Sequence, residues 1–304
     1  MPSATVLVTG ASGYLGQHLC VHLAAQEHVA VVGTYASNPS LVPDGVTKVQ
    51  ANLATGEGLA SVAAAHTFTH VVNCAAISQP KACEDDEAFA MALNVPTHAL
   101  ALANRQGAAF IHISTDQVYD GTRALSDEDT EVAPVNAYGR SKVAAEQHIA
   151  ENAAGRHVCF RSSIIYGPEP PKSVNRGLFL QFCRKAVAEA TEPFTFFHDE
   201  YRNPVYVSDI CRIVGALVHA PSWPLARPVY CMGGPDRLSR VDFARRVAAL
   251  VGASDRNIEE VSAASVDRGV ASPADISMNS ARLFDELKLA PTPFDDGARA
   301  SLGV

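Results

Sequence analysis

Apolar residues in the first half of the chain gather into short, nearly continuous runs that alternate with longer segments of helical periodicity. The runs lie at about residues 5–9, 29–34, 46–50, 70–74, 108–114 and 157–162, and the helical segments at about 14–26, 57–66, 86–106 and 137–153. Continuous apolar runs are typical of parallel strands that are buried on both faces of a sheet. The alternation therefore predicts an α/β fold with a doubly wound parallel (Rossmann) sheet.

The pattern changes after residue 167, where the prolines of segment 168–171 interrupt regular structure. Beyond it we expect helices at about 175–190, 209–219, 239–251 and 280–288, and strand-like pieces around 194–207 and 228–232. The sequence thus predicts a Rossmann domain over residues 1–167. Residues 168–304 are expected to form a smaller C-terminal α/β cap, with some segments returning to the main sheet.

Composition narrows the class of protein. A chain of 304 residues with 47% hydrophobic and 18% charged residues is ordinary for a globular protein with a large core. The net charge of −8, without a basic stripe, argues against nucleic-acid binding. No apolar run approaches the ~20 residues of a membrane span, and Met1 to Ala4 lead directly into the first run, so we expect no targeting peptide and no membrane attachment.

The cysteines and histidines bear on the cellular compartment and on metal binding. The seven cysteines are scattered without a Cys-x-x-Cys pair, which predicts buried free thiols in a reducing, cytoplasmic environment. His18 and His22 are spaced four apart on a predicted helix, but no third ligand accompanies them. We therefore expect no metal site.

A glycine-rich turn follows the first apolar run and precedes the first helical segment. Gly10 allows a sharp turn out of the strand, Gly13 allows the backbone to approach a phosphate, and Gly16 allows the helix to pack closely. The N–H groups and the positive end of the helix dipole would then face an anion. This order predicts a dinucleotide site whose pyrophosphate lies against the turn from Gly10 to Gly16.

Tyr138 and Lys142 form the second chemical signal. Their i, i+4 spacing places them on one face of a helix. A phenol alone is a poor acid at neutral pH, but a neighbouring ammonium stabilises its phenolate. Thr115 ends the fifth predicted strand, at the edge where ligands bind to such sheets, and its hydroxyl can contact the same carbonyl oxygen. The three residues predict the catalytic group of a carbonyl reductase.

Over nearly its whole length the chain resembles the extended short-chain dehydrogenase/reductases. It is most similar to the dTDP-4-dehydrorhamnose reductase branch, which includes the regulatory β subunit of methionine adenosyltransferase. The resemblance is carried by the glycine turn 10–16, Val71 to Ala76, Asn94-Val95, Ser114 to Gly121, Tyr138 to Lys142, Arg161 to Gly167 and the late stretch Arg268 to Leu283.

The resemblance implies a role for each matched position. Thr115, Tyr138 and Lys142 would be the catalytic triad, with Lys142 also on the nicotinamide ribose, and Asn94 would support that lysine. The pyrophosphate contacts would be Gly10, Ser12, Gly13, Tyr14, Leu15 and Gly16. The remaining cofactor contacts would be Thr34, Tyr35, Asn52, Leu53, Ala75, Ala76, Asn94, Ser163 and Ile165. Substrate contacts would be Lys81, Thr115, Gln117 and Arg202, with Lys81 and Arg202 on a diphosphate.

Two departures refine these expectations. The second predicted strand ends in Thr34-Tyr35 with neither a carboxylate for a ribose hydroxyl nor an arginine for a 2′-phosphate. We therefore expect a weak preference for NADP(H), with NAD(H) as the alternative. Gln117 stands where the sugar 4,6-dehydratases of the superfamily carry a glutamate, and an amide cannot ionise, so water elimination is not expected.

Three functions stay open at this point. The first is an NAD(P)H-dependent reductase of a nucleotide-linked 4-keto-6-deoxysugar, such as an enzyme of dTDP-rhamnose biosynthesis. The second is an NADP-binding, non-catalytic regulatory subunit that docks on the catalytic subunit of methionine adenosyltransferase. The third is a nucleotide-sugar epimerase. The sequence leaves open the sugar, and whether the chain forms a homodimer.

Overall fold

A seven-stranded parallel sheet forms the centre of the protein. The computed structural model describes residues 3–174 and 177–304. The strands lie across the sheet in the order β11-β6-β5-β4-β1-β2-β3, so the strand order reverses between β1 and β4. Their bounds are β1 Ala4–Thr9, β2 Val29–Tyr35, β3 Thr47–Gln50, β4 His70–Asn73, β5 Ala109–Thr115, β6 His157–Ser162 and β11 Val229–Met232. The doubly wound parallel sheet expected from the sequence is confirmed.

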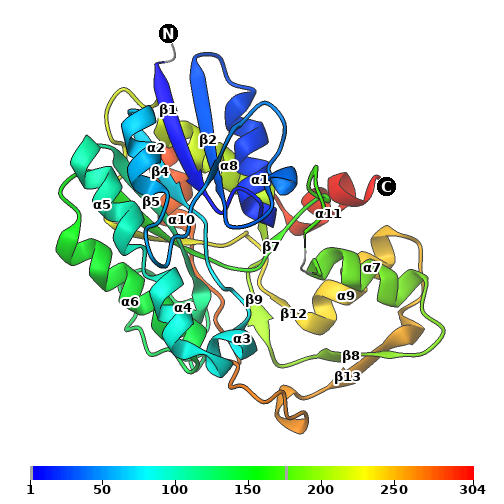
Figure 1. Cartoon of the computed structure of the whole chain (residues 1–304). Coiled ribbons are helices and arrows are strands. Elements are labelled where there is room, and N and C mark those ends of the chain that lie inside the picture. The colour runs from blue at the N-terminus through cyan, green and yellow to red at the C-terminus, as the bar shows by residue number, and fades with distance from the viewer. Residues whose placement is uncertain (1–2, 175–176) are drawn as a thin grey trace.

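Helices cover both faces of this sheet (Figure 1). On one face, the strands share a hydrophobic cluster with α1 (Tyr14–Ala24), α8 (Val207–His219) and α10 (Ala281–Leu287). On the other face, they share a second cluster with α2 (Leu59–Ala65), α5 (Thr97–Gln106) and the C-terminal half of α6 (Ala137–Asn152). Burial on both faces explains why the strands read as continuous apolar runs.

The expected single helix over 86–106 is wrong. The structure divides it into α4 (Glu87–Asn94) and α5, with Val95 in an extended conformation before Pro96. Proline lacks a backbone N–H and disfavours the helical conformation of the residue before it, so one continuous helix cannot pass this point. Two short helices were not expected, α3 (Pro80–Asp85) and α11 (Phe294–Leu302). The first turn of α11 holds Asp295 and Asp296, whose negative charges are stabilised by the positive end of the helix dipole.

Much of the second half of the chain forms a smaller lobe with its own core. Its helices are α7 (Phe179–Ala188), α9 (Arg240–Leu250) and α11, which pack with the paired strands β8 (Phe194–Phe197) and β13 (Ile258–Val261). Phe179, Phe243 and Phe294 meet Tyr166 in an aromatic cluster. The other segments, β11, α8 and α10, lie on the main sheet. The expected boundary at residue 167 stays a prediction.

Short elements join the two parts. Two further strand pairs form, β7 (Ile165–Tyr166) with β10 (Val205–Tyr206), and β9 (Tyr201–Arg202) with β12 (Leu238–Ser239). The 3-10 turns are Pro39–Leu41, Asp116–Val118, Asp255–Asn257 and Ala263–Ser265. Residues 262–278, here called the strap, run from the lobe to the sheet domain, where Met278 forms a β-bridge with Ser126 (Figure 1).

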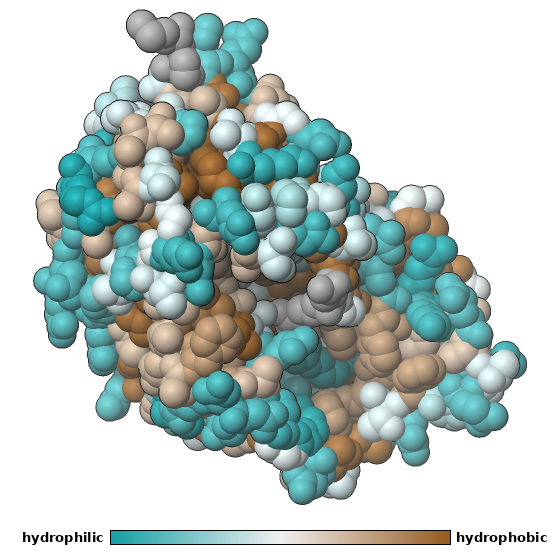
Figure 2. All heavy atoms as spheres, in the orientation of Figure 1, coloured by the Kyte–Doolittle hydropathy of each residue, from teal (hydrophilic) through white to brown (hydrophobic). Residues whose placement is uncertain are grey.

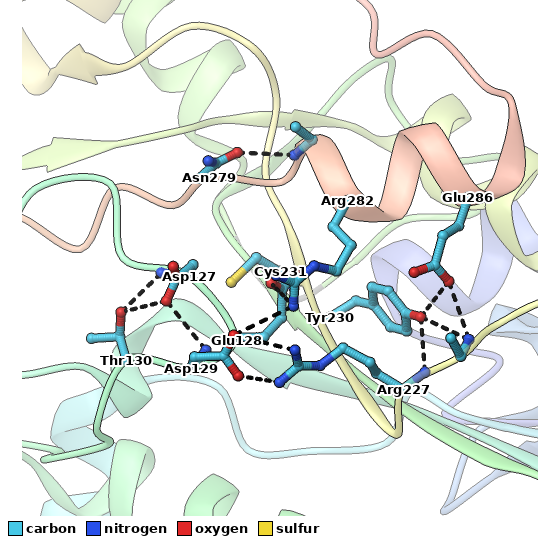
Figure 3. Close-up of polar contacts among 12 residues, drawn as sticks. Asp127, Glu128, Asp129, Thr130, Arg227, Tyr230, Cys231, Asn279, Arg282 and Glu286 are labelled. Atoms are coloured by element: carbon cyan, nitrogen blue, oxygen red, sulfur yellow. Dashed lines mark hydrogen bonds and ion pairs between the residues drawn. The ribbon is translucent and has the colours of Figure 1, made fainter.

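The outer edge of β11 is covered by polar contacts rather than by another strand. The Glu128 carboxylate accepts a hydrogen bond from the Cys231 N–H at 3.1 Å, and Arg282 lies 3.3 Å from the same carboxylate. Arg227 pairs with the neighbouring Asp129 (Figure 3). A carboxylate on the ladder side of an edge strand blocks pairing with a further strand.

The cysteines agree with the sequence prediction of free thiols. None of the seven is in a disulfide, and all except Cys74 are buried. Within residues 3–174 and 177–304, no group of three or more His, Cys, Asp or Glu side chains is placed to hold a metal ion. No helix in that part of the chain is long and apolar enough to cross a membrane.

Candidate active site

The glycine turn after β1 leaves no room for side chains at two of its three glycines. Gly10 has φ +67°, and a Cβ added to it would lie 2.9 Å from the Ala75 backbone. A Cβ on Gly16 would lie 2.1 Å from the Gly10 carbonyl oxygen. A Cβ on Gly13 would meet that oxygen at 3.3 Å and no other neighbour closely, so Gly13 faces open space. The turn is thus closely packed at Gly10 and Gly16. It is open at Gly13, at the N-terminus of α1.

The end of β2 holds this turn in place. The Gly10 N–H donates to Thr34 Oγ1 at 3.2 Å, and the Ala11 N–H donates to the Thr34 carbonyl oxygen at 3.0 Å. Thr34 is buried and Tyr35 is half-buried. The hydroxyl of Thr34 therefore supports the loop that would contact a dinucleotide.

Tyr138 lies in the first turn of α6, which packs against the turn that follows Thr115. A Cβ on Gly139 would lie 2.2 Å from the Gln117 carbonyl oxygen, so only glycine permits this approach. Asn136 caps α6 through a bond from the Gly139 N–H and donates from its own amide to Gln117 Oε1 at 2.9 Å. Gln117 thereby anchors the start of α6, and the helix that carries Tyr138 and Lys142 meets the carboxyl end of β5.

Thr115 and Asp116 form a buried pair at that strand end. The Thr115 hydroxyl lies 3.2 Å from Asp116 Oδ1 and accepts the Gln117 N–H at 3.2 Å. Ser163 donates to the other Asp116 oxygen at 2.9 Å. Burial raises the pKa of Asp116, while the nearby Arg202 charge opposes that shift. To bind a substrate oxygen, the Thr115 hydroxyl has to turn away from this carboxylate.

Lys142 lies one helical turn beyond Tyr138 and is 1% exposed. Its Nζ lies 3.1 Å from Nε2 of His112, a buried residue on β5. Burial lowers the pKa of Lys142 to about 8. The ammonium is therefore held near its titration point, without a buried carboxylate bonded to it.

Asn94 supports this helix through a neighbour of Lys142. Its amide donates to Ser141 Oγ at 2.8 Å and to the Ile77 carbonyl oxygen at 3.0 Å, and it accepts the Ile77 N–H. Ser141 donates in turn to the Tyr138 carbonyl oxygen. Asn94 thus ties the loop after β4 to the turn of α6 that carries both predicted catalytic side chains.

The other predicted cofactor residues lie on several elements. Ala75 and Ala76 follow β4 and are half-buried, and Ile165 is half-buried on β7. The Ser163 hydroxyl bridges Asp116 and the Asn203 N–H. Asn52 is exposed and accepts the Ala54 and Thr55 N–H groups in a turn, while Leu53 packs against the second core cluster. These assignments stay predictions.

Lys81 and Arg202 differ sharply in their surroundings. Lys81 is exposed on α3 and pairs with Asp85, with its stem beside Gly269 of the strap. Arg202 is buried and donates to the carbonyl oxygens of Tyr201, Pro273 and Ala274. Burial lowers the pKa of Arg202 to about 10. Arg202 holds the strap here, and its predicted contact with a diphosphate would use the donors that remain.

Several supporting residues were missed by sequence reasoning. They are His112, Asn73, Asn136 and the buried pair Glu146 and Arg161. Arg161 Nη2 lies 2.8 Å from Glu146 Oε2, and Ser114 donates to the same carboxylate. The pair joins α6 to β5 and β6. The available signal was a polar residue inside an apolar strand run, as at His112 and Arg161.

The surface is hollowed between the sheet domain and the smaller lobe (Figure 2). The glycine turn, the end of β5 and the first turn of α6 lie at the carboxyl edge of the sheet, where the strand order reverses. This is the place where open α/β sheets bind their ligands. The glycine turn and the side chains of Thr115, Tyr138 and Lys142 thus lie along the edge of the sheet where a dinucleotide and its substrate would bind.

Comparison with known proteins identifies the family. The profile of the RmlD substrate binding domain matches residues 4–303. The chain is 28% identical over 293 residues to a probable low-salt glycan biosynthesis reductase of Haloferax volcanii, covering 95% of this chain and 94% of that protein. It is 28% identical over 306 residues to methionine adenosyltransferase 2 subunit beta of Danio rerio, covering 99% and 91%.

A solved structure agrees over the same length. The dTDP-4-dehydrorhamnose reductase of Bacillus anthracis, in complex with NADP, superposes with a TM-score of 0.81 at 21% identity, covering 99% of both chains. The fold and the family profile place the chain among the extended short-chain dehydrogenase/reductases. Within that class, it belongs to the RmlD substrate-binding domain family. The resemblance found in the sequence is confirmed.

Proposed function

We propose that the protein is an NAD(P)H-dependent reductase of a nucleotide-linked 4-keto-6-deoxysugar. The observation that carries the proposal is the placement of Tyr138 and Lys142 on one face of α6, against the strand end that carries Thr115. A reductase of this kind needs a proton donor, a cation beside it and a hydroxyl for the carbonyl oxygen at one place. The family and its reductase members support this function.

The residues around the glycine turn fit a dinucleotide. Gly13 faces open space that a side chain would fill, and α1 begins there without a side-chain cap on its free N–H groups. Such a helix start stabilises a phosphate. Gly10 to Gly16 would hold the pyrophosphate, and Lys142 the nicotinamide ribose. A bound nicotinamide cofactor would supply the hydride for the carbonyl carbon.

The side chains of this chain would do the remaining work. The Tyr138 phenol donates a proton to the substrate oxygen as negative charge develops there, and the Lys142 ammonium stabilises the phenolate left behind. The Thr115 hydroxyl, turned from Asp116, would donate a hydrogen bond to the same oxygen. Gln117 holds α6 through Asn136 and has no ionisable group, so it supplies no base for water elimination.

The direct test is turnover. Purified protein is incubated with NADPH and dTDP-4-keto-6-deoxy sugars, and the loss of NADPH absorbance is followed. Sugar-dependent oxidation supports the proposal. If no nucleotide-linked 4-keto sugar tested causes NADPH oxidation, the proposed reductase function is wrong.

The competing function is a regulatory subunit that binds NADP and docks on methionine adenosyltransferase. It is kept because identity to the Danio rerio subunit equals identity to the reductase of Haloferax volcanii. Its test is co-purification of a methionine adenosyltransferase from cell extract by wild-type protein that turns over no nucleotide-sugar. The Lys142 and Tyr138 positions do not separate the two functions, because a regulatory relative can retain both.

Cofactor preference is expected to be weak. β2 ends in Thr34 and Tyr35, and Thr34 Oγ1 accepts the Gly10 N–H. This strand end therefore offers neither a carboxylate that would favour NADH nor an arginine that would favour NADPH at the ribose 2′ position. We predict that calorimetry gives dissociation constants for NADPH and NADH within about tenfold, equivalent to about 1.4 kcal/mol, with NADPH the tighter. A roughly hundredfold preference for NADH would contradict this prediction.

Lys81→Ala is expected to raise KM for the nucleotide-sugar by about tenfold or more, because a charge-assisted hydrogen bond to a diphosphate is lost. kcat and thermal stability should change little, since Lys81 is exposed and its pair with Asp85 is a surface ion pair. The matched control is Lys185→Ala, an exposed lysine in the last turn of α7. Equal KM values for the Lys81→Ala and Lys185→Ala variants would show that Lys81 does not contact the substrate.

A further inference from the structure

A buried chain of hydrogen bonds leads from Lys142 to the loop beside the glycine turn. Lys142 Nζ lies 3.1 Å from His112 Nε2, and His112 Nδ1 lies 3.0 Å from the Asn73 amide. Asn73 lies 2.7 Å from Thr9 Oγ1, which also accepts the Ala75 N–H at 3.3 Å. The four side chains from Lys142 to Thr9 are at most 2% exposed. Burial therefore shields these bonds from the solvent.

The sheet register places the three strand residues of this chain in one row. Thr9 on β1 is opposite Asn73 on β4, and Asn73 is opposite His112 on β5. Residues at one level of neighbouring parallel strands point to the same face, and here α6 brings Lys142 to the end of the row. The row reaches Ala75, whose backbone packs against Gly10. The predicted catalytic lysine and the predicted phosphate loop are thus linked through the sheet.

The protonation state of Lys142 decides which atom donates and which accepts in each hydrogen bond of this row. Burial and the Lys142 charge hold the pKa of His112 well below its usual value, so its ring is neutral and carries one N–H. An ammonium at Lys142 donates to Nε2, which leaves the ring proton on Nδ1 for the Asn73 carboxamide oxygen. The Asn73 NH₂ group then faces Thr9.

A neutral amine at Lys142 has a lone pair and can accept a hydrogen bond, so the bonds of the row can then run the other way. His112 Nε2–H then donates to Nζ, and Nδ1 accepts from the Asn73 NH₂ group. The Thr9 hydroxyl donates to the Asn73 oxygen. The two arrangements differ by a turn of the Asn73 amide group and the shift of protons along the row. The structure has Asn73 in the second arrangement, with Oδ1 toward Thr9 and Nδ2 toward His112.

We propose that His112 is a positioning residue that, with Asn73 and Thr9, sets the proton count and direction of the Lys142 amine and couples it to the loop at Ala75. The proposal rests on the proposed function only in placing Lys142 against the ribose of a nicotinamide cofactor. It assigns a role to a strand histidine that the Tyr138–Lys142 pattern alone does not contain.

The other titratable groups near Lys142 do not replace His112. Glu146 follows one turn later on α6, and its carboxylate is already bonded by Arg161 and Ser114. Cys74 after β4, Cys83 on α3 and Cys159 on β6 also act on the lysine. Burial raises the pKa of each of these thiols, to about 11 for Cys83, so they are neutral when Lys142 titrates. His112, in contrast, lies within hydrogen-bond distance of Lys142 Nζ.

The test measures NADPH affinity from about pH 6 to about pH 10 in wild type, His112→Leu and His112→Gln. Because burial lowers the pKa of Lys142 to about 8, wild-type affinity should fall as pH rises through that region. Leucine offers no acceptor, so the midpoint should move about one to two units to lower pH. Glutamine can accept from Lys142 and donate to Asn73, and should restore most of the shift.

The matched control is His70→Leu. His70 is buried on β4, where it contacts Thr69 and burial lowers its pKa to about 4. It lies at the other end of that strand from Asn73 and should leave the midpoint unchanged. Equal midpoints for wild type and His112→Leu, or equal shifts in His112→Leu and His112→Gln, would overturn the proposal.

A second readout needs no cofactor. The stability of His112→Leu, Lys142→Met and the double variant is measured by urea unfolding. His112→Leu should destabilise the Lys142 protein more than the Lys142→Met protein, because only the former buries an amine that has lost its partner. Additive effects would overturn the proposal. This cycle decides the role of His112 even if no nicotinamide cofactor binds, an outcome that would instead refute the proposed function.

Discussion

Tyr138→Phe is expected to lower kcat by about 10²- to 10⁴-fold and to leave NADPH affinity nearly unchanged. The phenol proton is needed only when charge develops on the substrate oxygen, so its removal acts on the transition state rather than on binding. Phenylalanine keeps the ring, which is 8% exposed and packs with Cys83, Ala90 and Ala137. Steady-state kinetics and calorimetry on the same preparation separate the two effects.

The control for this substitution is Tyr230→Phe on β11. The Tyr230 hydroxyl accepts the Ala226 and Arg227 N–H groups and donates to Glu286, at the sheet edge away from the glycine turn (Figure 3). Its loss should cost about 1 kcal/mol of stability and no turnover. If Tyr138→Phe turns over substrate as fast as Tyr230→Phe, this tyrosine is not the proton donor.

Gly13→Val is expected to abolish nicotinamide cofactor binding while the protein stays folded. The first added carbon meets only the Gly10 oxygen at 3.3 Å, so the turn accommodates it with a small adjustment. The branched side chain then occupies the space in front of the α1 N-terminus, where the pyrophosphate would bind. Calorimetry with NADPH and circular dichroism would measure the two effects separately.

Gly155→Val provides the comparison. Gly155 is exposed, and a Cβ there would meet no neighbour within 4 Å, so the same change of residue should alter neither binding nor fold. Gly16→Ala should behave differently from both, because its Cβ would lie 2.1 Å from the Gly10 oxygen and must distort the turn itself. NADPH bound by Gly13→Val as tightly as by wild type would show that the turn is not the phosphate site.

The sequence predicted the sheet because its signals are local. Runs such as Ala109 to Ile113 must be buried on both faces, and the order of strands and helices then leaves few topologies. The six expected strands of the first half all formed within about two residues of their expected bounds. The prediction of one helix over 86–106 was wrong because it followed the apolar periodicity and gave too little weight to Pro96. The missing N–H of this proline divides the segment into two helices.

The site was predictable where a motif carries its own chemistry. The residue types alone suggest a phosphate site at the turn from Gly10 to Gly16 and a proton donor at Tyr138, four residues before Lys142. The supporting groups were not predictable, because their partners are distant in sequence: Asn136 reaches Gln117, and Asn94 reaches Ser141. The row from His112 to Thr9 requires the register of three strands. That Arg202 holds the strap through backbone carbonyl oxygens also has no sequence signal.

In the proposed reaction, a hydride passes from the nicotinamide ring to the carbonyl carbon of a nucleotide-linked 4-keto sugar. Its most direct measurement uses NADPH deuterated at the transferable position of the nicotinamide ring, with mass spectrometry and NMR of the sugar product. We predict one deuterium at the former keto carbon for each cofactor oxidised, and none from the Tyr138→Phe protein on the same time scale. A wild-type protein that binds NADPH, leaves every such sugar unlabelled and co-purifies with a methionine adenosyltransferase would contradict it.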